Sequence, residues 1–273
     1  MSSAGWPVAP LRAAARERPR LVAALIAVAA VAWWSTAVRM AGMDQGPGTD
    51  LGAPVWFVGA WVVMMAAMML PSAAPVIVLY ARMAAGRGPA PHAFAAGYLM
   101  VWGLAGMAAY TVADAGRALC GSALAWDGAG RWVAGGTLLV AAAYELTPLK
   151  DACLRRCRSP VGFLMSSWRP GLLGATHMGA RHGAWCIGCC WALMASLFAL
   201  GVMSLTWMAL VAALVLVEKT VPWRRAATWA TALVLLVLGV VLIAAPGRLP
   251  GMVVPGGAAG GGDMPATVDM VLR

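Results

Sequence analysis

Long apolar segments with few charged residues recur along most of this chain of 273 residues. Segment 21–38 is the clearest case, because it carries no charge and is long enough to span a lipid bilayer as a helix. Hydrophobic residues make up 62% of the chain and charged residues 11%, whereas a soluble domain has about 25% charged residues. The sequence therefore predicts an integral membrane protein, with the lipid bilayer as its first partner.

Apolar segments of similar length predict an all-α, polytopic bundle of about seven transmembrane helices within residues 21–245. Their expected bounds are 21–38, 55–80, 93–112, 131–147, 183–203, 205–217 and 226–245. The other segments are a basic cytoplasmic N-terminus at 1–20, a cytoplasmic loop with cysteines at 148–182, and a tail at 246–273. The tail is rich in Gly and Pro, a composition that favours disorder.

The distribution of Lys and Arg indicates how the bundle is oriented. If the N-terminus is cytoplasmic, the seven spans place 15 of the 20 basic residues inside and 5 outside. Cytoplasmic loops of membrane proteins carry such an excess, so we expect the N-terminus inside and the C-terminal tail outside. The same loops account for the net charge of +10 without nucleic acid as a partner.

Five of the six cysteines form two groups with helical spacing. Cys153 and Cys157 are i, i+4, and Cys186, Cys189 and Cys190 are i, i+3, i+4, so each group shares one helix face. Both groups are expected near the reducing cytoplasm, which favours free thiols over disulfides. We predict a soft-metal site for copper or zinc, with Cys190 as a spare ligand because adjacent cysteines do not easily point into one small site.

Other ligand candidates lie near these cysteines or in the second span. His177 and His182 precede Cys186 and are auxiliary candidates, although each alone also suits an interfacial position. Thioethers suit Cu(I), and the second span holds two i, i+4 methionine pairs: Met64, Met65, Met68 and Met69. Methionine also fills gaps in cores, so packing competes with a metal path from these residues to the thiolates.

Two carboxylates, Glu145 and Glu218, are expected near the cytoplasmic ends of spans. An ionisable group at membrane depth is costly and suggests function, which makes Glu145 a further auxiliary ligand candidate. Lys150 and Lys219 lie close to them in sequence, so local ion pairs are the alternative.

Alternative functions use the same cysteines. Cys186 and Cys189 form a C-x-x-C pair that suits a membrane thiol–disulfide oxidoreductase. A non-catalytic membrane subunit, alone or in a homo-oligomer, could instead hold a structural metal, and cysteines could simply pack, as we expect of Cys120. No residue set for hydrolysis or phosphoryl transfer is present, so we predict no catalytic residues.

Four motifs carry a resemblance to known sequences. They are MMAAMMLPSAAP (64–75), YELTPLKDACLRRCRSP (144–160), GAWCIGCCWALM (183–194) and the pair Glu218–Lys219. Across about residues 20–245, the chain resembles an uncharacterised bacterial family of predicted metal-binding integral membrane proteins. The resemblance implies metal binding and a multi-pass location in the bacterial inner membrane, and it implies no particular activity or protein partner.

Overall fold

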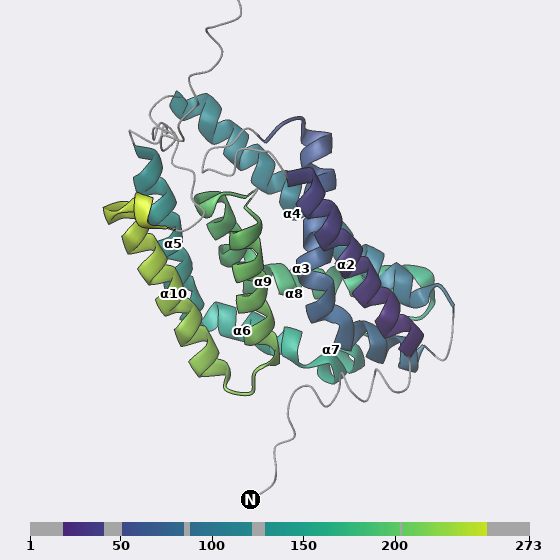
Figure 1. Ribbon diagram of the computed structural model, residues 1–273. Helices are drawn as coiled ribbons and strands as arrows, with labels where there is room; N and C mark the ends of the chain where they lie inside the picture. The colour runs from purple at the N-terminus through teal and green to yellow at the C-terminus, as the bar shows by residue number, and fades with distance from the viewer. Residues whose placement is uncertain (1–18, 41–50, 85–87, 122–128, 203, 250–273) are drawn as a thin grey trace, which may run out of the picture.

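The structure is a computed structural model that describes residues 19–40, 51–84, 88–121, 129–202 and 204–249. These residues form helices and connecting segments without strands (Figure 1), which confirms the predicted all-α fold. The elements are α2 (Pro19–Met40), α3 (Pro54–Met83), α4 (Ala90–Cys120), α5 (Arg131–Glu145), α6 (Pro148–Arg158), α7 (Pro160–Ser167), α8 (Gly171–Leu200), α9 (Leu205–Thr220), α10 (Arg224–Ala244) and the 3₁₀ turn η3 (Pro246–Arg248). Most of the expected N-terminal segment and tail lies outside the described residues.

Among these helices, α2, α3, α4, α8 and α10 are long and apolar enough to cross a membrane. Each of the seven expected spans falls on a helix, but α5 and α9 have only 15 and 16 residues. Their lengths of about 22 and 24 Å are shorter than the hydrocarbon core of about 30 Å. A membrane crossing by these two helices therefore stays a prediction.

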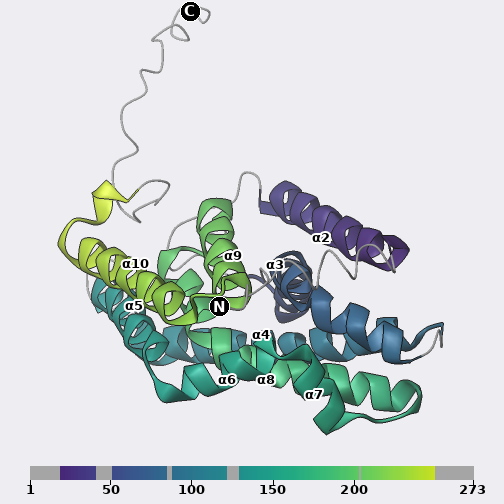
Figure 2. The ribbon, with the colours of Figure 1, turned by 90° about the horizontal axis from the view of Figure 1, so that it is seen from below.

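Three helix pairs organise the bundle. Helix α8 packs along α4, α10 along α5, and α2 along α3. Both views show α5 and α10 side by side, and Figure 2 shows α2 on the outside of α3. The short helices α6 and α7 connect α5 to α8, and α6 itself packs on α8.

Glycines let α4 and α8 approach closely. A Cβ atom at Gly97 would overlap the carbonyl oxygen of Thr176, and one at Gly179 would overlap that of Phe94. Small residues at such contacts are typical of membrane helices. The contact turns one face of α8 toward α4 and buries it.

Helix α8 begins at Gly171, whereas the hydropathy pattern predicts a span that starts at 183. Residues 171–182, expected in a loop, form the first turns of the helix instead. Their exposed side includes His177 and Arg181, while Ala175 and Met178 are buried, so this part is amphipathic. A hydropathy average over all side chains does not detect such a helix, because the polar face offsets the hydropathy of the apolar face.

Candidate metal centre

Helix α6 is fixed in place at both ends. At its start, the backbone N–H of Lys150 donates to the Thr147 hydroxyl at 3.3 Å, an N-cap that satisfies a free donor of the first turn. At its end, the Arg158 guanidinium donates to the carbonyl oxygen of Glu218 on α9 at 2.6 Å. These contacts hold the inner face of α6, with Lys150 and Cys153 buried, against the rest of the bundle.

The three cysteines of α8 form a compact, buried cluster. The sulfur atoms of Cys186, Cys189 and Cys190 all lie within 4.8 Å of one another. The Cys189 and Cys190 sulfurs are 3.3 Å apart, and the Cys189 sulfur is also 3.2 Å from the Cys186 carbonyl oxygen. The expectation that adjacent cysteines do not share one site is therefore wrong, since their side chains turn the same way here. We call these three residues the α8 thiol cluster.

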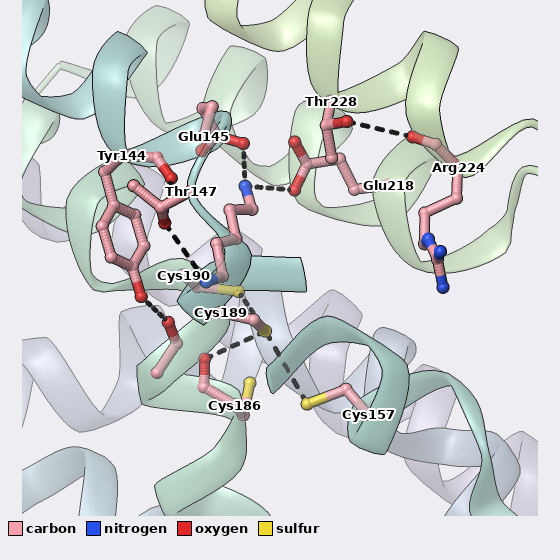
Figure 3. A network of polar contacts seen from close by, with 12 residues as sticks. Tyr144, Glu145, Thr147, Cys157, Cys186, Cys189, Cys190, Glu218, Arg224 and Thr228 are labelled. Carbon is pink, nitrogen blue, oxygen red and sulfur yellow. Dashed lines mark hydrogen bonds and ion pairs between the residues drawn. The ribbon is translucent and has the colours of Figure 1, made fainter. Parts of the chain in front are cut away.

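The cysteines of α6 reach the α8 thiol cluster from the side. Figure 3 shows Cys157 pointing toward Cys189, with 3.7 Å between the two sulfur atoms. The Cys153 sulfur lies against Gly188, where an added Cβ would be 2.7 Å away. Burial raises the pKa of the Cys153 thiol. The two cysteine groups thus lie together, with Cys157 nearer to the cluster and Cys153 packed on the α8 backbone.

Two polar side chains from other helices contact the Cys186 sulfur. The Lys219 ammonium of α9 donates to it at 3.1 Å, and the Tyr98 hydroxyl of α4 lies at 3.1 Å. Lys219 also donates to the Ser72 hydroxyl of α3 at 3.1 Å. Sequence reasoning did not place Tyr98 or Ser72 at this site. On α9, the sequence singles out only the pair Glu218–Lys219, as one of the quoted motifs.

A buried ionic triad lies beside the sulfur atoms. The Lys150 ammonium pairs with Glu145, as the sequence suggested, and with Glu218 at 2.7 Å. Burial lowers the pKa of Lys150, but the carboxylates of Glu218 and Glu145 raise it more, so its net shift is upward. Glu218 therefore pairs with Lys150 of α6 rather than with its neighbour Lys219. Within the described chain, the Oε1 atoms of both glutamates are buried without a hydrogen-bond partner.

The remaining candidates are divided between surface and core. His177 is exposed, whereas His182 is buried one turn before Cys186.

Ser72 connects the methionine segment of α3 with the site, because its hydroxyl donates to the Met69 carbonyl and accepts from Lys219. All four methionines of the second span are buried: Met64, Met65, Met68 and Met69. Cys120 is exposed at the end of α4, so the expectation that it packs as a small buried residue is wrong.

This arrangement suits a soft metal ion. Three thiolates from one helix would bind Cu(I), and Cys157 could complete a set of four sulfurs that also suits Zn(II). Thiolates buried in an apolar bundle need compensating charge, and the Lys219 ammonium provides one positive charge at Cys186.

Comparison with known proteins supports a metal-binding assignment. A protein-family model described as PpoB2, copper chaperone, matches residues 58–242. That range is more than half of the chain and includes all five clustered cysteines. The family's name differs from the one that the sequence motifs suggested, but both descriptions indicate metal binding. No curated protein and no solved structure matches the chain.

Proposed function

Because this chain belongs to the PpoB2 copper chaperone family, we propose that it binds Cu(I) at the α8 thiol cluster and passes the ion to an acceptor protein. Copper is the cargo in this proposal. The observation that carries it is the mutual approach of three buried sulfurs within 4.8 Å on one helix. Cys157 supplies a further sulfur 3.7 Å from Cys189, through which a bound ion could exchange.

Copper fits this role better than zinc. Structural Zn(II) prefers a closed set of four ligands, which makes release slow. Cu(I) accepts two or three thiolates, so a cluster of three leaves an incoming ligand room to attack. The description of the family supports the same choice.

Copper analysis tests the proposal directly. The protein is purified in detergent under reducing, anaerobic conditions, loaded with Cu(I) and freed of excess metal. We expect near-stoichiometric copper in the wild type and its loss in the double variant Cys186→Ser, Cys189→Ser. The exposed Cys120 provides the matched control, and Cys120→Ser should keep its copper. A wild type without bound copper would overturn the proposal.

We further propose that the protein crosses the bacterial inner membrane with its N-terminus in the cytoplasm. The five membrane-like helices support a membrane location, and the distribution of basic residues over the seven expected spans supports this orientation. In it, Cys120 lies outside, so an impermeant maleimide added to spheroplasts should label Cys120 in a variant that lacks the other cysteines. Labelling only after membrane lysis would contradict the orientation.

The methionine segment of α3 offers a path toward the thiolates. Ser72 contacts Lys219, which contacts Cys186, and the four methionines precede Ser72 on the same buried helix. Replacing Met64, Met65, Met68 and Met69 with Leu should abolish copper transfer but retain binding. Unchanged transfer would exclude this path.

Thiol redox chemistry is the second candidate, favoured by the approach of Cys157 to Cys189. A disulfide would require their sulfurs to close from 3.7 Å to about 2.05 Å, with two electrons passing to an oxidised partner. Mass spectrometry after mild oxidation would detect this bond. A protein that forms no Cys157–Cys189 disulfide after mild oxidation would argue against a redox function.

A further inference from the structure

Side chains able to bind soft metals recur every four residues along the buried side of α8. Such spacing places each side chain about 6 Å further along the helix, with a gradual rotation about its axis. The row consists of Met178, His182, Cys186, Cys190 and Met194, and all five are buried. Thioether, imidazole and thiolate groups are the ligands that copper prefers. The α8 thiol cluster is therefore one part of a longer row.

His182 is the member of this row that carries a buried nitrogen available as a ligand. Its Nδ1 atom is buried, and nothing in the described part of the chain forms a hydrogen bond with it. The rings of Phe94, Tyr98 and Phe163 surround the imidazole, with centroid distances of 6.2, 5.8 and 5.1 Å. A buried polar nitrogen without a partner is costly, which calls for a functional explanation.

His182 lies close to the α8 thiol cluster but is not part of it. It lies one helical turn before Cys186, and the Tyr98 ring that packs on it carries the hydroxyl found 3.1 Å from the Cys186 sulfur. His182 does not belong to the group of ligand atoms that lie within 4.8 Å of one another. His182 is therefore a separate candidate ligand next to the α8 thiol cluster.

Aromatic contacts connect His182 with a surface pocket. The pocket is lined by residues that include Tyr80, Trp168 and Gly171, near the start of α8. The Tyr80 ring packs on Trp168 and on Phe94, with centroids 5.5 and 5.2 Å apart, and Phe94 packs on His182. The rings of Phe94 and Tyr80 thus lie between the imidazole and this pocket.

We propose that His182 is a transient ligand that receives Cu(I) from the pocket side and hands it to Cys186. This inference rests on the proposed copper function. In the transfer, a bond between the Cys186 thiolate and Cu(I) forms while the bond between the His182 imidazole nitrogen and Cu(I) breaks. The oxidation state of copper is unchanged, and no external electron donor is needed. The free imidazole then accepts the next ion.

The rate of copper loading tests this step. Detergent-purified protein is mixed with the Cu(I)–bicinchoninate complex in a stopped-flow instrument, and the loss of that complex is followed by absorbance. His182→Phe keeps an aromatic ring of similar size within its aromatic surroundings but has no ligand nitrogen. We expect loading at least about tenfold slower than in the wild type, with the same final copper content. His177→Phe, on the exposed side of the same helix, should load at the wild-type rate.

The outcomes separate this inference from the proposed function. Wild-type loading kinetics in His182→Phe would overturn the inference and leave the copper site intact. A final copper content below wild type in both His182→Phe and His182→Gln would also overturn it, because His182 would then be a permanent ligand or a structural residue. A wild type that takes up no copper would overturn the proposed function itself.

Discussion

The ammonium group of Lys219 on α9 lies 3.1 Å from the sulfur of Cys186 on α8. These residues are 33 positions apart and meet only because α9 packs against α8. A hydrogen bond from a charged donor is stronger than one between neutral groups, and it favours the thiolate form that binds metal. Lys219 of α9 therefore places a positive charge beside the α8 thiol cluster.

Removing this charge should weaken copper binding. For Lys219→Met we expect an affinity for Cu(I) about 10- to 100-fold lower, since a hydrogen bond to a charged group contributes about 1.5–3 kcal/mol. Competition with a Cu(I) chelator such as bathocuproine disulfonate measures the change. Lys219→Arg keeps the charge and should lose less. Equal affinities for the wild type and Lys219→Met would show that the contact does not stabilise the bound state.

The buried triad predicts a large loss of stability when only its cation is removed. Lys150→Met leaves the carboxylates of Glu145 and Glu218 buried without a counter-ion, which costs about 3–5 kcal/mol. Reversible unfolding in mixed micelles measures the difference. The triple variant Glu145→Gln, Lys150→Met, Glu218→Gln should recover much of the loss. A single variant as stable as the wild type would mean that the carboxylates hold protons instead.

The Lys150→Met variant also predicts a dependence on alkaline pH. The pKa of Lys150 is raised, so its stabilising contribution is complete below the unfolded-state pKa of about 10.4 and is lost as pH rises through the folded-state value. The difference in stability between the wild type and Lys150→Met should not shrink near neutral pH but should shrink above pH 10.4. A difference that shrinks between about pH 7 and 9 would contradict the raised pKa.

Close packing of α4 on α8 predicts that a single methyl group disturbs the fold. Gly179→Ala would place a Cβ against the carbonyl oxygen of Phe94, and such overpacking costs about 1–3 kcal/mol. Gly136 on α5 is the control, because open space surrounds its Cβ position. Gly136→Ala should be neutral or stabilising by up to about 1 kcal/mol. Thermal unfolding in detergent would compare them, and equal effects would mean that the backbones can separate freely.

Much of the fold follows from hydropathy because membrane helices must satisfy their own backbone hydrogen bonds within each segment. The segments at 21–38 and 226–245 therefore match α2 and α10 closely. The start of α8 cannot be predicted from hydropathy, because His177 and Arg181 on its exposed side lower the average hydropathy of this helical stretch. Hydropathy averages detect apolar length and miss amphipathic extension.

The metal centre follows from the sequence only in part. Helical spacing placed Cys186, Cys189 and Cys190 on one face, and local geometry brings their sulfurs together as that spacing requires. The contacts of Tyr98 and Lys219 with Cys186 depend on how α4 and α9 pack on α8. No local pattern in one chain encodes that packing, so these contacts could be found only in three dimensions, although Lys219 itself belongs to one of the quoted motifs.

X-ray absorption at the copper edge tests the central claim most directly. The measurement uses the wild type loaded with one equivalent of Cu(I) in detergent, beside the Cys120→Ser control. We expect a Cu(I) edge and a first shell of two or three sulfur atoms, supplied by the α8 thiol cluster and Cys157. A first shell dominated by nitrogen or oxygen would contradict copper binding at these cysteines.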